Sequence, residues 1–72
     1  MRYFKKYKDR ETSIEITKEE ARENLTGYWK EEALEDIFSN DKGFCLYTPY
    51  ADIWTMTEDG AVPMAGFYGT VG

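Results

Sequence analysis

The sequence predicts a small α+β domain, in which two short helices pack on one antiparallel sheet. Three observations lead to this fold class. Two isoleucines alternate with polar residues in Ser13–Ile16, which is the period of two that a half-buried strand needs. Residues 44–48 and 52–57 are rich in β-branched and aromatic side chains. Between these segments, apolar residues recur at helical spacing.

The first hairpin is expected in the N-terminal sixteen residues. Tyr3–Lys8 is predicted to form a strand, and Ser13–Ile16 is predicted to be its partner, with residues 9–11 as the connection. A lysine of the first strand would then face Glu11 or Glu15 across the ladder. Each such pair would stabilise the sheet by up to about 1 kcal/mol.

Two helices are expected in the middle of the chain. Thr17-Lys18-Glu19-Glu20 has the pattern of a capping box, so the first helix should begin there and end near Leu25. Gly27 is suited to the left-handed conformation that ends many helices. The second helix is predicted from about Tyr28 to Ser39. Its apolar stripe comprises Trp29, Ala33, Leu34, Ile37 and Phe38.

A second hairpin is expected from the strands at 44–48 and 52–57. Pro49 should mark their junction, because proline has no N–H to donate within a central strand. Glu58-Asp59-Gly60 predicts a further turn that returns into 61–64. The whole chain, residues 1–72, is expected to be one domain, with residues 66–72 as an extended, flexible tail.

The predicted core joins the second helix to one face of the sheet. The helix would contribute Trp29, Leu34, Ile37 and Phe38. The sheet would contribute Ile14, Ile16, Phe44, Leu46, Ile53 and Trp54.

The composition argues against catalysis and metal binding. The chain has no histidine and one cysteine, Cys45, so it offers no zinc cluster and no Cys–His pair. Because Phe44 and Leu46 flank Cys45, this thiol is expected to be structural and buried. We therefore expect a non-enzymatic protein without a cofactor or a metal. The unpaired cysteine and the lack of a long apolar run predict a cytoplasmic protein that does not enter a membrane.

Charge is strongly segregated along the chain. Residues 1–10 contain five bases and one acid, giving +4, whereas residues 11–72 contain four bases and thirteen acids, giving −9. The two parts sum to the net charge of −5. Such segregation affects the electrostatic potential at the protein surface, and hence which partner molecules can bind. It does not specify the fold.

The acidic part predicts a protein-interaction module. Glu31 with Glu35, and Glu32 with Asp36, lie four residues apart on the second predicted helix. Each like-charge pair costs a helix roughly 0.2–0.5 kcal/mol, so helix stability does not explain them. We expect these four residues to bind an unidentified partner protein, with a basic surface as the natural complement. The simpler alternative is a solvated face that only keeps the protein in solution.

The basic part suggests a second hypothesis, a nucleic-acid-binding accessory factor. Cations would contact phosphates while the interleaved Tyr3, Phe4 and Tyr7 would contact bases. The cations are Arg2, Lys5, Lys6, Lys8 and Arg10. The alternative is a strand whose lysines protect an exposed sheet edge. The net charge of −5 also opposes binding to a polyanion.

The aromatic content predicts self-association. Six Tyr, four Phe and two Trp exceed what one small core readily encloses, and residues 44–68 contain only three charged side chains. A homodimer would cover the surplus apolar surface. The alternative is a monomer in which the C-terminal tail covers the sheet.

Residues 51–69, ADIWTMTEDGAVPMAGFYG, resemble the tail of small uncharacterised proteins carried on mobile, conjugative elements of Gram-positive bacteria. The helix opening at Thr17–Ala21 is similar to theirs as well. The resemblance implies a bacterial accessory protein of unknown function and supplies no catalytic residue.

Overall fold

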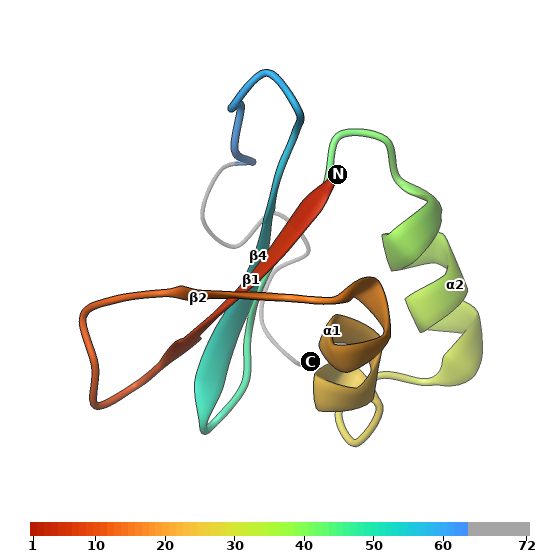
Figure 1. Ribbon diagram of the computed structural model, residues 1–72. Helices are drawn as coiled ribbons and strands as arrows, with labels where there is room; N and C mark the ends of the chain where they lie inside the picture. Colours follow the sequence, from red (N-terminus) through yellow and green to blue (C-terminus); the bar gives the residue numbers. More distant parts are fainter. Residues whose placement is uncertain (64–72) are drawn as a thin grey trace.

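The computed structural model describes residues 1–63, which form a four-stranded antiparallel sheet with two helices beside it (Figure 1). The strands are β1 (Arg2–Tyr7), β2 (Ile14–Ile16), β3 (Cys45–Tyr47) and β4 (Ala51–Met56), and the helices are α1 (Lys18–Leu25) and α2 (Glu31–Ser39). Their arrangement confirms the predicted α+β fold with an N-terminal hairpin, two helices and a C-terminal hairpin.

The two central strands of the sheet come from opposite ends of the described chain. The strand order is β2-β1-β4-β3, so β1 lies beside β4. Their register runs over six pairs, from Arg2↔Met56 to Tyr7↔Ala51. Each outer pair is half as long, with three paired positions in β1–β2 and three in β3–β4. The central pairing is therefore the longest ladder in the structure.

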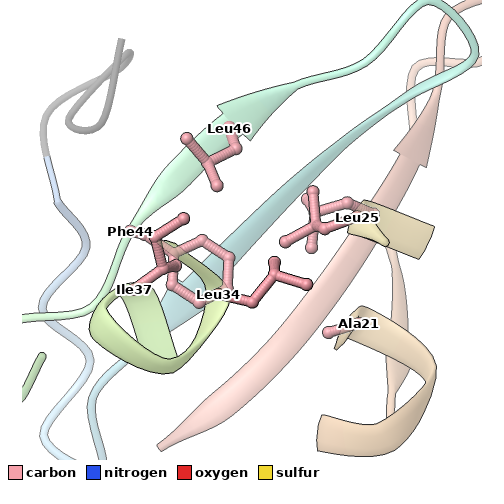
Figure 2. Close-up of a cluster of buried hydrophobic side chains, with 7 residues drawn as sticks. Ala21, Leu25, Leu34, Ile37, Phe44 and Leu46 are labelled. Atoms are coloured by element: carbon pink, nitrogen blue, oxygen red, sulfur yellow. The ribbon is translucent and has the colours of Figure 1, made fainter. Parts of the chain in front are cut away.

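The hydrophobic core lies between the helices and one face of the sheet (Figure 2). Alternation along β4 places Ile53 in this core, and the paired Leu46 of β3 lies beside it. The buried cluster comprises Ala21, Leu25, Leu34, Ile37, Phe44, Leu46 and Ile53. Tyr3, Ile16, Trp29 and Phe38 are partly buried and pack against the cluster. The predicted core was therefore right for α2 and for most of the sheet positions, although it omitted the contributions of α1 and Tyr3.

Three of the predicted burial sites are wrong. Trp54 follows Ile53 directly, so strand alternation turns it to the opposite side of the sheet, where its ring stacks on Phe4 with centroids 4.4 Å apart. Cys45 pairs with Trp54 and is half-buried on that same side, rather than in the core. Ile14 faces the helices' side but is 50% exposed. We call the side of the sheet opposite the helices the open face.

The first helix begins as predicted and ends differently. The Thr17 hydroxyl accepts from the Glu20 amide, and the Glu20 carboxylate accepts from the Thr17 amide, each over 3.1 Å. Gly27 does not have the left-handed conformation expected of it, and Thr26 before it caps the helix in a right-handed conformation. The second helix begins at Glu31 rather than near Tyr28. Residues 28 and 29 instead continue from α1, since both of their amides donate to the Leu25 carbonyl.

The link from α2 to β3 requires a glycine. Gly43 has a φ of +83°, and a Cβ there would lie 2.1 Å from the Thr55 hydroxyl. That hydroxyl accepts from the Phe44 amide over 2.9 Å and donates to the Phe44 carbonyl over 3.3 Å. Thr55 is 1% exposed, so both bonds are shielded from water. Together they fix Phe44, the largest fully buried side chain, in the core.

The two turns around β4 follow the sequence signals in part. Pro49 does separate β3 from β4, and the Thr48 hydroxyl closes this turn by donating to the Ala51 carbonyl over 2.7 Å. The predicted turn at residues 58–60 is present, with Gly60 at a φ of +92°. The chain that returns from this turn forms no strand at residues 61–63, which have no regular structure. Residue 64 and the predicted tail at 66–72 lie outside the described residues.

We expect Gly43→Ala to destabilise the protein by about 3–4 kcal/mol. The left-handed backbone costs a residue with a Cβ about 1–2 kcal/mol, and displacing the Thr55 hydroxyl loses two hydrogen bonds of about 1 kcal/mol each. Urea unfolding of the variant and the wild type measures the difference.

Gly27→Ala is the matched control, because nothing lies within 4 Å of a Cβ at that position and its backbone is not left-handed. It should leave stability unchanged or raise it by up to about 1 kcal/mol. Equal effects of the two substitutions would contradict the role given to Gly43.

Candidate functional site

The four acidic residues predicted as a partner site lie together on α2. Glu31, Glu32, Glu35 and Asp36 are all exposed, and we call them the acidic face. Leu34 and Ile37 on the other side of the helix are buried in the core. The period of 3.6 therefore turns the four carboxylates to solvent, as the spacing predicts.

One cation of the described chain reaches the acidic face. The Arg22 guanidinium donates to Glu31 over 2.6 Å and also lies 5.9 Å from the centroid of the Phe38 ring. Within residues 1–63, the carboxylates of Glu32, Glu35 and Asp36 form no ion pair. The acidic face thus keeps three charges that no cation of residues 1–63 neutralises by an ion pair.

The local sequence of α2 does not compensate for this charge. Lys30 occupies the N-cap without a side-chain hydrogen bond, and the last turn has no basic residue. Glu31 and Glu32 benefit from the positive end of the helix dipole, whereas Glu35 and Asp36 lie toward the negative end. Packing of Leu34 and Ile37 must therefore hold α2 in place.

The five basic residues of the alternative site do not form one patch, because strand alternation divides those of β1 between the two faces of the sheet. Arg2 and Lys6 point to the open face, while Lys5 points to the side of the helices. Two of the five are also neutralised. The Arg2 guanidinium donates a bidentate pair of hydrogen bonds to the Glu15 carboxylate, over 3.0 and 3.1 Å. The Lys8 ammonium forms an ion pair with the Asp52 carboxylate over 2.6 Å.

The ion pair across the first hairpin differs from the expected one. A lysine was predicted to face Glu11 or Glu15, but the register pairs Glu15 with Phe4 and brings Arg2 beside it. These hydrogen bonds lower the pKa of the Glu15 carboxyl and raise that of the Arg2 guanidinium. The guanidinium also lies 5.1 Å from the centroid of the Phe4 ring.

Lys5 and Arg10 converge on Tyr7 at the hairpin end of the sheet. The Lys5 ammonium lies 4.5 Å from the centroid of the Tyr7 ring, and the Arg10 guanidinium lies 5.5 Å from it. Tyr7 is 36% exposed, and the neighbouring Ile14 is 50% exposed. Neither cation forms an ion pair within residues 1–63. We call Lys5, Tyr7, Arg10 and Ile14 the hairpin floor.

The open face carries a group of aromatic side chains that the sequence analysis missed. Phe4 and Trp54 stack, the Trp54 indole donates to the Ser13 hydroxyl over 3.1 Å, and the Lys8 ammonium lies 5.3 Å from the centroid of the Tyr47 ring. Burial, and secondarily Cys45, raise the pKa of the Tyr47 hydroxyl. The signal for this group was the alternation of β4, which separates Trp54 from Ile53.

Other kinds of site are absent from the part of the chain that the structure describes. Residues 1–63 enclose no pocket and contain no group of three side chains able to hold a metal ion. Among these residues, neither helix has the length and apolar character needed to cross a membrane.

Comparisons of the chain with protein-family models, with curated proteins and with solved structures found no match.

We expect stability to fall in acid as Glu15 becomes protonated. Because its pKa is lowered in the folded state, Glu15 stabilises the fold above its usual pKa of 4.5, and this contribution is lost as the pH falls through the lowered value. Glu15→Gln should flatten this decline in urea unfolding between pH 6 and about pH 3. Glu11→Gln, at an exposed position of the connecting turn, should retain the wild-type profile. Identical acid profiles for Glu15→Gln and the wild type would show that the Arg2–Glu15 pair contributes nothing.

Proposed function

We propose that the chain is a non-enzymatic protein-interaction module that binds a basic segment of a partner protein through its acidic face. The observation that supports this proposal most is that Glu32, Glu35 and Asp36 are exposed without a cation of the described chain beside them. A partner that supplies lysine or arginine side chains would neutralise the three carboxylates and remove their mutual repulsion.

Ion pairs at the rim of an interface supply specificity and speed of association more than affinity. Each exposed pair contributes roughly 0.2–1 kcal/mol, so three pairs alone would bind weakly. Aromatic side chains are the usual source of the remaining affinity. Tyr28 and Trp29 directly precede α2, are half-buried, and pack edge to face with ring centroids 6.4 Å apart. We propose these two rings as the apolar anchor beside the acidic face.

The proposed place of action is the cytoplasm of a bacterium, where the chain would serve as an accessory protein of a mobile element. The free thiol of Cys45 suits such a reducing compartment. The setting on a mobile element is proposed from the resemblance expected for residues 51–69 in the sequence analysis.

We expect a variant with Glu32→Gln, Glu35→Gln and Asp36→Asn to lose its partner. The experiment immobilises the full chain, captures proteins from bacterial cytosol, and identifies those that elute as the salt concentration is raised. Screening weakens exposed ion pairs, so the partner should elute at moderate salt. The control carries Glu11→Gln, Glu19→Gln and Glu23→Gln, which remove the same charge from exposed positions outside α2.

The proposal requires a basic protein that the wild type and the control retain and the α2 variant releases. Capture of the same proteins by all three chains would contradict it. Circular dichroism should be unchanged in the variants, because the substituted side chains are exposed and do not contact the core.

A further inference from the structure

The hairpin floor is a second surface that the helices leave uncovered. Tyr7, Arg10 and Ile14 are exposed, and Lys5 is half-buried. On the helices' side of the sheet, Tyr3 and Ile16 pack against the core, whereas Tyr7 and Ile14 further along the same strands are exposed. Figure 1 shows the reason, since the loop joining β1 to β2 extends away from both helices. The sheet is therefore longer than the helical layer that covers it.

The hairpin floor combines apolar area with two cations that have no ion-pair partner in residues 1–63. Lys5 and Arg10 flank the Tyr7 ring, and Ile14 lies across the ladder from Lys5. Tyr50 borders the same end of the sheet, because its carbonyl accepts a hydrogen bond from the Lys8 amide over 3.2 Å. Its side chain is 72% exposed. An occupant of this surface must present negative charge together with a surface that can cover apolar side chains.

The chain itself has a surface of that description. The acidic face of α2 offers three carboxylates that form no ion pair within residues 1–63, and the half-buried rings of Tyr28 and Trp29 precede the same helix. The helices and the hairpin floor lie on the same side of the sheet, although α2 lies away from the hairpin loop (Figure 1). One molecule cannot bring its own acidic face to its own hairpin floor, because both are fixed to the same rigid sheet and core. A second copy can do so, and a two-fold axis then forms the contact twice.

We propose that two copies of this chain form a two-fold dimer, in which the acidic face of each copy lies on the hairpin floor of the other. This inference rests on the proposed function, because it uses the same acidic face. It names a second copy of the chain as another molecule that binds there. A basic partner protein would then compete with the dimer contact. Such competition restricts binding to partners whose charge complements the acidic face better than Lys5 and Arg10 do.

A second copy fits the hairpin floor better than a nucleic acid does. Arg2 and Lys8 are already bound to carboxylates, and Lys6 points to the other side of the sheet. A polyanion would therefore meet two free cations on a protein of net charge −5.

The test uses charge reversal in the purified full chain. The floor variant carries Lys5→Glu and Arg10→Glu, and the face variant carries Glu32→Lys and Glu35→Lys. Each variant alone opposes like charges at both contacts of the dimer, so its dissociation constant should rise roughly tenfold or more. Light scattering over a roughly hundredfold range of protein concentration measures the mass of each sample.

Mixing the two variants provides the discriminating measurement. In a mixed dimer, the acidic floor of one chain meets the basic helix of the other, and the remaining floor and helix have their original charges. The mixture should therefore regain the mass of two chains, although neither variant does so alone. Where Lys5→Glu prevents folding, as circular dichroism would show, Arg10→Glu alone serves as the floor variant, since Arg10 is exposed and outside the strands.

Three results would overturn the dimer. The wild type could keep the mass of one chain at every concentration, both variants could dimerise as the wild type does, or the mixture could fail to recover. A single-stranded oligonucleotide that binds the wild type and not the floor variant, in fluorescence anisotropy, would assign the hairpin floor to a nucleic acid instead. Because these measurements need no partner protein, their outcome is independent of the capture experiment for the proposed function.

Discussion

The pairing of β1 with β4 is the interaction on which the rest of the structure depends. It joins segments separated by more than forty residues, and it must offset the entropy of closing that loop. Every other element is placed by it: β2 adds to the free edge of β1, β3 adds to that of β4, and the helices cover the face that presents Tyr3 and Ile53. The same register stacks Phe4 on Trp54 on the open face.

Strand geometry decides what the charge segregation means in space. A β-strand turns successive side chains to opposite faces of its sheet, so the basic residues of β1 are divided between two sides. Lys5 joins Arg10 at the hairpin floor, whereas Arg2 is bound to Glu15 on the open face. The acidic residues escape this division because a surface helix turns positions three and four apart to the same side. In the folded protein the acidic residues of α2 therefore form one surface, whereas the basic residues of the N-terminal segment are divided between two.

Local signals in the sequence predicted local structure well. The Thr17–Glu20 capping box and the stripe on α2 depend on neighbours within one or two helical turns, so the sequence alone is sufficient for them. Gly27 and Gly43 show the limit. Both come after a helix, but of the two Gly43 alone is left-handed, and a distant residue, Thr55, leaves no room for a Cβ there. The ion pair of Arg2 and the position of Trp54 likewise depend on register, which adjacent residues do not specify. For the candidate site, exposure of the acidic face followed from periodicity, whereas the hairpin floor required knowledge of where the helices end.

Native-state hydrogen exchange tests the central role of the β1–β4 ladder most directly. The amides of Tyr3–Lys5 and Asp52–Trp54 belong to residues with a strand on either side, so we expect them to exchange only when the whole protein unfolds. Their exchange free energies should equal the free energy of unfolding measured in urea. Amides of α2, which lacks a side-chain cap, should exchange through smaller openings. Equal or faster exchange in the central strands than in α2 would contradict this account, because the fold would then be held together from the helices rather than from the sheet.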